Sequence, residues 1–297
     1  MRLSPSDRRW LAGSACRAAR EAGDFIRASR PAIVERKSGG QSEASQVVTE
    51  IDRRSQEIIL EVLQESVTRC SLGVLSEELH DDGSRLERDF FWSIDPLDGT
   101  LPYVEARPGY AVSIALVSRE GIPEIGVIVD PVHDTLHCAI RGGGITLNGE
   151  PWSPPPPRAN VGVSVFADRS LLNHPRYATV VAALDTGSVD SGSTGAGVLL
   201  GSGAVMNACR TLESPPACYF KFPKEEEGGG ALWDFAASAC LFTEAGAVAT
   251  NIHGGPLDLN RTDGTWMNHE GVIFATSDAL AARITEIYRD GSAARGT

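Results

Sequence analysis

Two short apolar runs in the first third of the chain end abruptly at carboxylates, and this feature most constrains the fold. Residues 72–75 stop at Ser76-Glu77-Glu78, and residues 90–94 stop at an acidic turn over 95–100. Runs of this length and composition are typical of buried β-strands. Side chains at the carboxyl ends of strands project into the crevice where α/β sheets bind ligands, so we expect these acidic residues to line a site.

The turn over 95–100 has the composition of a metal and phosphate site. Asp95 and Asp98 are three residues apart, with Pro96 between them to stiffen the turn. Gly99 permits close backbone approach, and a helix that begins at Thr100 would offer free N–H groups to a phosphate. Two carboxylates beside such a cradle would repel phosphate unless a divalent cation lay between them, and hard oxygen ligands favour Mg²⁺ or Mn²⁺. The turn therefore predicts metal-assisted phosphate chemistry, although the same residues also occur in ordinary loops.

The remaining pattern alternates helices and strands, which indicates an α/β or α+β fold of layered sandwich type. In the first half we expect helices over 7–29 and 49–65 and strands over 111–117, 124–129 and 133–140. In the second half we expect strands over 161–166 and 217–222 and near 247 and 271–275, and helices over 174–184, 197–209, 233–245 and from 277. Four prolines at 154–157 predict a boundary between domains over 1–150 and 151–297.

Composition argues against several classes of function. The chain has 27 Lys+Arg against 39 Asp+Glu, a net charge of −12. This disfavours a nucleic-acid polymer as partner, because neutralising its phosphates needs clustered Lys and Arg side chains. No apolar run approaches the roughly 18 residues that cross a bilayer, so no membrane partner is expected. The six cysteines form no Cys-x-x-Cys pair, which disfavours a zinc site and a redox dithiol. We expect reduced thiols in a cytoplasmic protein.

Four motifs, in order along the chain, resemble the signatures of the inositol monophosphatase superfamily. Residues 94–100, Ile-Asp-Pro-Leu-Asp-Gly-Thr, are similar to its central signature. Residues 48–52, Val-Thr-Glu-Ile-Asp, and 75–78, Leu-Ser-Glu-Glu, resemble its upstream element and its metal-binding Glu-Glu element. Residues 233–246 begin Trp-Asp-Phe-Ala-Ala and end Glu-Ala-Gly, as in the C-terminal element. Four ordered motifs are far more specific than any one alone.

The resemblance implies a five-layer αβαβα sandwich and Mg²⁺-dependent, lithium-inhibited hydrolysis of phosphomonoesters. It implies that Glu77, Asp95 and the carbonyl of Leu97 hold one metal ion. Asp95, Asp98 and Asp234 would hold a second. Asp234 stands at the start of a predicted helix, which would bring the second half of the chain into the site.

Catalytic and phosphate-binding roles follow from the same resemblance. Glu77 and Thr100 would orient and deprotonate the attacking water. Asp98 joins them, because the second ion that it helps to hold would stabilise the leaving oxygen. The amides of Gly99 and Thr100 would hold phosphate oxygens. Asp52 would anchor a threonine hydroxyl behind the site, or serve only the structure of its helix.

One departure from the family concerns a third, weaker metal ion. Family members usually carry an aspartate where this chain has Gln46, and bisphosphate nucleotidases often carry one where it has Ala44. Glu43 is close enough in sequence to substitute. An amide binds Mg²⁺ more weakly than a carboxylate, so two ions are expected and a third is left open. The departure also admits a catalytically weakened relative that only binds a phosphate ligand.

Two features favour a 3′(2′),5′-bisphosphate nucleotidase acting on adenosine 3′,5′-bisphosphate over an inositol-1-monophosphatase. Ser76 precedes the glutamate pair, as in many nucleotidases, and residues 219–223 resemble their Tyr-x-Arg/Lys-x-Pro segment. Lys221 thereby places a cation where inositol enzymes tend to carry a hydroxyl-binding glutamate, which suits a second phosphate.

The remaining contacts to the substrate are expected from two loops. Ser193 and Thr194 would line the leaving-group pocket, and because their loop lacks the usual lysine, fructose-1,6-bisphosphate and the 2′-phosphate of NADP stay open. Lys37 resembles a family lysine near the phosphate, but it equally fits an exposed surface. The resemblance is compatible with a monomer or a homodimer.

Overall fold

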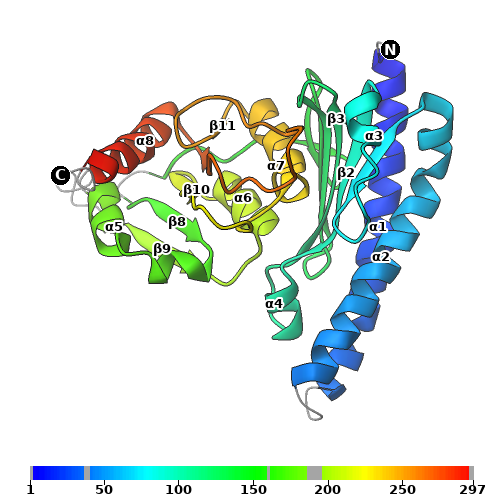
Figure 1. The fold of residues 1–297 in the computed structure, drawn as a ribbon, viewed down its shortest axis with the longest axis horizontal. Coiled ribbons are helices and arrows are strands. Elements are labelled where there is room, and N and C mark those ends of the chain that lie inside the picture. The colour runs from blue at the N-terminus through cyan, green and yellow to red at the C-terminus, as the bar shows by residue number, and fades with distance from the viewer. Residues whose placement is uncertain (1–2, 37–40, 159–160, 186–195, 294–297) are drawn as a thin grey trace.

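The computed structural model describes residues 3–36, 41–158, 161–185 and 196–293, which form two β-sheets with helices on both faces of each (Figure 1). Two long helices, α1 (Pro5–Arg36) and α2 (Gln41–Cys70), lie side by side along the outer face of the first sheet. Both extend well beyond the ranges predicted from the sequence. No described helix combines the length and apolarity needed to span a membrane.

The first sheet has seven strands in sequence order, of which only β1 and β2 pair in parallel. Every residue of the central strands β2 and β3 is buried, because helices cover both faces of the sheet. The strands are β1 (Gly73–Ser76), β2 (Phe90–Asp98), β3 (Ala111–Ser118), β4 (Pro123–Asp130), β5 (Thr135–Ile140), β6 (Gly144–Leu147) and β7 (Glu150–Trp152). Two short helices, α3 (Ser84–Glu87) and α4 (Thr100–Val104), follow β1 and β2.

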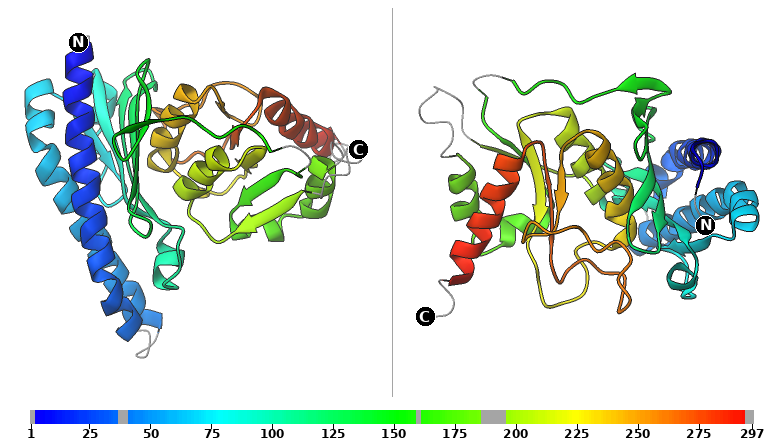
Figure 2. Two further views of the ribbon diagram at one scale, coloured as in Figure 1. Left: turned by 180° about the vertical axis from the view of Figure 1, so that it is seen from behind. Right: turned by 90° about the horizontal axis from the view of Figure 1, so that it is seen from above.

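The second sheet has five strands in the order β11-β12-β10-β8-β9. Its strands are β8 (Ser164–Ala167), β9 (Gly197–Leu200), β10 (Ala217–Lys221), β11 (Val248–Thr250) and β12 (Val272–Ala275). Helices α6 (Ala204–Glu213) and α7 (Leu232–Glu244) pack between the two sheets, with contacts to both. The 3₁₀-helix η2 (Arg169–Asn173) leads to α5 (Tyr177–Asp185), which lies with α8 (Asp278–Ala293) on the far face (Figure 2).

The resulting order of layers is helix, sheet, helix, sheet, helix, which confirms the five-layer sandwich. A single apolar cluster includes Phe91 of the first sheet, Phe235 of α7 and Phe274 of the second sheet, so the two sheets share one core through the middle helices. Strand β4 and helix α7 approach each other closely at Gly126, since an added Cβ there would lie 2.5 Å from the carbonyl oxygen of Ala237 in α7. The domain boundary near residue 150 stays a prediction.

Several element predictions were wrong in ways that the backbone explains. The single helix expected over 197–209 is the strand β9 followed by α6, because Gly201 takes a φ of 110° and the extended Gly203 caps α6. The helix expected over 174–184 begins only at Tyr177, after η2 and Pro175. Strand β2 does not stop at Ile94 but continues to Asp98. Strands β6 and β7 were not predicted.

Candidate active site

An irregularity in strand β2 turns Asp95 and Asp98 toward one side. Asp95 pairs with Ser113 of β3 and Asp98 with Ala111, so three steps along β2 match two along β3. Side chains three residues apart in a regular strand point to opposite faces, and the extra residue of a bulge corrects this. Pro96, which has no N–H to donate, occupies the irregularity, and its carbonyl accepts a hydrogen bond from Ser55 Oγ at 2.9 Å.

Asp98 is buried, and both of its carboxylate oxygens accept backbone hydrogen bonds from the start of α6. The N–H of Ala204 donates to Oδ1 at 3.0 Å, and that of Val205 donates to Oδ2 at 2.9 Å. Gly203 is required here, since a Cβ would lie 2.2 Å from Asp98 Oδ2. The carboxylate of Asp98, from the first half of the chain, is thus oriented by two N–H groups from the second half.

Asp234 joins these two aspartates from the first turn of α7. Its carboxylate accepts the N–H of Ala231, the residue that caps the helix. One carboxylate oxygen from each of Asp95, Asp98 and Asp234 lies within 4.8 Å of the others, so the structure brings these three residues together. The packing of α7 against β3 and β4 makes this possible, because Asp234 comes from a part of the chain distant from Asp95 and Asp98.

Glu77 stands at the open edge of this cluster, directly after β1. Its N–H donates to the Ile94 carbonyl at 3.2 Å, which fixes it beside the strand that carries Asp95. Although the residue as a whole is exposed, loss of solvation around its carboxyl group and repulsion from Asp234 raise its pKa to about 7. Desolvation and the charges of Glu77 and Glu78 likewise raise the pKa of Asp52 to about 8.

The innermost carboxylate has no protein partner for one of its oxygens. Asp95 Oδ1 accepts the N–H of Leu97 at 3.0 Å, whereas the buried Oδ2 receives no hydrogen bond from any described residue. Burial, and then the charges of Glu77 and Asp234, raise the pKa of Asp95 well above its usual range. An orphaned oxygen among carboxylates fits a cation between them, and an all-oxygen donor set suits Mg²⁺.

The backbone after Asp98 takes the conformation that the motif predicted. Gly99 has a φ of 84°, and a Cβ there would lie 2.7 Å from the Gly109 carbonyl oxygen. Thr100 is the exposed first residue of α4, and Leu97 is buried between the two aspartates. Both therefore lie next to the cluster.

Lys221 lies at the end of β10 and brings positive charge near the cluster. Its Nζ pairs with Asp168 Oδ2 at 2.6 Å and donates to the Gly229 carbonyl. The charge of Lys221 acts to lower the pKa of Asp98 and of Asp234, although burial keeps both raised overall. No sequence motif pointed to Asp168, whose position depends on the parallel pairing of β8 with β10.

A cavity of about 460 Å³ opens beside Lys221 at the ends of β8 and β10. Its lining is mostly apolar and includes His174, Phe222, Phe235 and Met267. Asp168 and Lys221, whose charges act on Asp98 and Asp234, also line the cavity, so it lies near the carboxylate cluster.

Other predicted residues fall elsewhere. Lys37, Ser193 and Thr194 lie outside the described residues, as do the side chains of 41–49, which include Gln46. Ser76 is buried, and its hydroxyl contacts Gln56 of α2.

Comparison with known proteins gives the same assignment as the motifs. A model of the inositol monophosphatase family matches residues 7–289. The chain belongs to the inositol monophosphatase family. Nus factor SuhB of Salmonella typhimurium is 30% identical over 247 residues, which cover 81% of this chain and 85% of SuhB. Inositol-1-monophosphatase of Synechocystis is 29% identical over 267 residues, covering 85% and 82%.

Solved structures of inositol monophosphatases share the fold. Inositol monophosphatase II of Staphylococcus aureus superposes with a TM-score of 0.71 at 22% identity, over 94% of this chain and 95% of the other. SaIMPase-II with 2′-AMP bound gives a TM-score of 0.65 at 19% identity, covering 89% and 91%. The same protein with inositol monophosphate bound gives 0.66 at 21% identity, covering 94% and 93%. This inositol monophosphatase family member is accordingly a metal-dependent phosphatase with a small phosphate ester as its substrate.

Proposed function

We propose that the protein is a cytoplasmic, Mg²⁺-dependent phosphomonoesterase that removes the 3′-phosphate of adenosine 3′,5′-bisphosphate. The observation that carries the reaction is the cluster of Asp95, Asp98 and Asp234 with one buried, unpartnered oxygen. The observation that supports this substrate is Lys221, a cation whose charge acts on that cluster and which lines a mostly apolar cavity.

Two Mg²⁺ ions are assigned to this donor set. Glu77, Asp95 and the Leu97 carbonyl are proposed to hold one, and Asp95, Asp98 and Asp234 the other. The hydrogen bonds to Asp98 leave room for this role, because each carboxylate oxygen has two lone pairs. Bound Mg²⁺ supplies positive charge that acidifies a coordinated water and offsets the charge of the phosphate.

The chain's own groups then orient the reactants. Glu77 is proposed to take a proton from the attacking water, and the Thr100 hydroxyl to orient that water. The N–H groups of Gly99 and Thr100 are proposed to hold phosphate oxygens. Mn²⁺ is the expected substitute ion, and Li⁺ the expected inhibitor.

The cavity favours a nucleoside over inositol as the leaving group. Its aromatic side chains offer stacking surfaces for a purine, whereas inositol presents a hydroxyl on every ring carbon and needs polar partners. A second phosphate would meet the ammonium of Lys221, in exchange for its pairing with Asp168.

Inositol-1-phosphate is the second candidate substrate, favoured by the Synechocystis relative and by the inositol monophosphate bound to SaIMPase-II. A phosphate-ligand-binding protein with weakened catalysis is the third candidate. Against it stands the complete set of Glu77, Asp95, Asp98 and Asp234.

Phosphate release from adenosine 3′,5′-bisphosphate and from inositol-1-phosphate, with Mg²⁺ and with or without Li⁺, tests the proposal. We expect the nucleotide to have the higher kcat/KM. Lys221→Glu should shift the ratio of the two kcat/KM values toward inositol phosphate by at least about tenfold, the worth of one charge-assisted contact. Arg17→Glu, an equal charge reversal at an exposed residue of α1 on the outer face of the first sheet, should keep the nucleotide preference. Wild-type preference for inositol phosphate would overturn the substrate assignment.

A further inference from the structure

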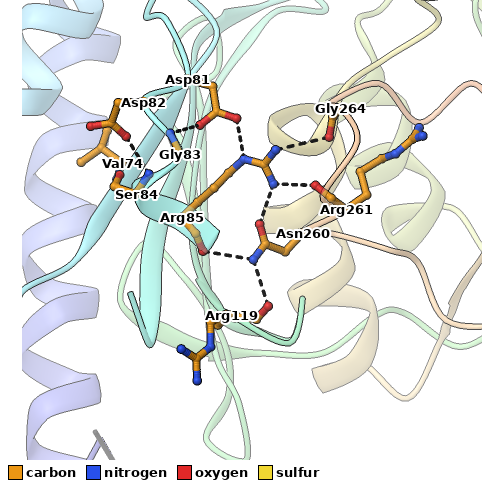
Figure 3. A network of polar contacts seen from close by, with 10 residues as sticks. All are labelled: Val74, Asp81, Asp82, Gly83, Ser84, Arg85, Arg119, Asn260, Arg261 and Gly264. Atoms are coloured by element: carbon orange, nitrogen blue, oxygen red, sulfur yellow. Dashed lines mark hydrogen bonds and ion pairs between the residues drawn. The ribbon is translucent and has the colours of Figure 1, made fainter. Parts of the chain in front are cut away.

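The loop that carries Glu77 is tied to the second half of the chain by one buried arginine (Figure 3). Arg85 of α3 is only 2% exposed. Its Nε donates to Asp81 at 2.7 Å, and its Nη1 donates to Asn260 Oδ1 at 2.8 Å and to the Arg261 carbonyl at 2.7 Å. A planar guanidinium that holds several partners at once fixes their relative positions more firmly than a flexible surface pair does.

Asn260 strengthens this connection in the opposite direction. Its Nδ2 donates to the Arg85 carbonyl at 3.1 Å and to the Arg119 carbonyl at 2.9 Å. Arg85 Nη2 adds a longer contact to the Gly264 carbonyl at 3.4 Å. The partners lie about 175 residues apart in sequence, so these bonds join the two halves directly.

At the Glu77 end, Asp81 closes the loop between β1 and α3. Its Oδ1 accepts the N–H of Gly83 at 3.0 Å, while its Oδ2 binds Arg85. Glu77 therefore has one fixed point at β1 and a second at the Asp81–Arg85 pair.

At the other end, the segment that follows Asn260 holds the residues just before Asp234. The N–H of Leu232 donates to the Thr265 carbonyl at 2.9 Å, and the N–H of Met267 donates to the Gly230 carbonyl at 2.9 Å.

Between those two bonds, Ala231 forms an antiparallel bridge with Trp266. Ala231 also donates its N–H to the Asp234 carboxylate. An unbroken series of contacts thus runs from the Glu77 loop through Arg85 and Asn260 to Asp234.

We propose that Asp81, Arg85 and Asn260 are positioning residues that set the separation of Glu77 and Asp234 and thereby the affinity for Mg²⁺. Pairing of β1 with β2 already fixes Glu77 against Asp95, but no ladder among the described strands joins the first sheet to the second. The inference rests on the proposed metal site, since it concerns how that site is assembled.

Calorimetric titration of the metal-free protein with Mg²⁺ tests it. Asp81→Ala and Asn260→Ala should each raise the Kd for Mg²⁺ at least about tenfold. The Kd of the double variant should be close to that of the single variant that binds Mg²⁺ more weakly, because both substitutions interrupt the same connection. In phosphate-release assays the Mg²⁺ concentration for half-maximal rate should rise, while kcat at saturating Mg²⁺ stays within about threefold of wild type.

Ser66→Ala is the matched control. It removes the buried hydrogen bond from Trp92 Nε1 to Ser66 Oγ, 3.0 Å long, between α2 and β2. Thermal unfolding without Mg²⁺ shows whether its stability loss matches that of the test variants, and its Kd should stay at the wild-type value. Should Asn260→Ala fail to fold, Asp81→Ala keeps the test open, because the Asp81 side chain is 27% exposed.

The outcomes separate the two claims. If the wild-type protein binds Mg²⁺ and Asp81→Ala and Asn260→Ala bind it with the same Kd, the positioning role alone is overturned. A wild-type protein that binds no Mg²⁺, or an Asp95→Asn variant that binds it as wild type does, overturns the metal site and the positioning role together.

Discussion

Replacing Gly203 by alanine tests whether Asp98 is held by the start of α6. Gly203 has φ −68° and ψ 174°, a conformation that alanine adopts freely, so the added methyl group acts only through contact. Its Cβ would lie 2.2 Å from Asp98 Oδ2 and 2.6 Å from Cγ, so the carboxylate must move away. Such a movement breaks the bonds from Ala204 and Val205.

The cost follows from those two bonds. Each lost bond leaves a buried N–H without a partner, which costs about 1–3 kcal/mol, and relaxation of the site recovers part of the loss. We expect the free energy of unfolding to fall by about 2–4 kcal/mol, measured by urea denaturation. The Kd for Mg²⁺ should rise at least about tenfold, since 1.4 kcal/mol of lost binding is a factor of ten.

Gly13→Ala is the control for this variant. Gly13 is exposed on α1 and its Cβ would meet nothing within 4 Å, so the change should stabilise the protein by about 0.5–1 kcal/mol. If Gly203→Ala has the wild-type free energy of unfolding and the wild-type Kd for Mg²⁺, the account of Asp98 is wrong.

Three other perturbations have defined outcomes. Mg²⁺ affinity should rise with pH between pH 5 and 7, because Glu77, whose pKa is about 7 in the metal-free protein, and the buried aspartates with raised pKa values must lose their protons to bind; calorimetry that shows no pH dependence refutes this. The folded-state pKa of Asp52, about 8, exceeds the ordinary aspartate value of 3.8, so Asp52 lowers stability progressively as the pH rises from 4 to 8. Asp52→Asn should therefore raise the free energy of unfolding of the metal-free protein by about 2 kcal/mol at pH 8 and leave it unchanged near pH 4, and equal urea midpoints at pH 8 would count against it. Gly126→Ala should cost about 1–3 kcal/mol in urea unfolding and reduce activity, because its Cβ would press on Ala237 of α7, and an unaffected variant would show that α7 can shift freely.

The sequence predicted the ligand candidates better than the elements that bring them together. The spacing and chemistry of the turn singled out Asp95 and Asp98, and resemblance to the family's C-terminal element singled out Asp234; the structure brings the three together. The bulge at Pro96 and the strand β9 were not predicted, since both depend on pairing with distant residues.

The connection through Arg85 and Asn260 has no sequence signal at all. Neither residue belongs to a motif, and only the packing of the two halves brings them together. The same holds for Asp168, which meets Lys221 across parallel strands.

Phosphate release from adenosine 3′,5′-bisphosphate by wild type and Asp95→Asn, titrated with Mg²⁺, tests the central claim most directly. Asp95 contributes to both proposed ion sites, so the account predicts strictly Mg²⁺-dependent release by wild type. Asp95→Asn should lower that release by at least about a thousandfold, or roughly 4 kcal/mol of transition-state stabilisation. Release without a divalent cation, or an Asp95→Asn variant as active as wild type, would contradict the account.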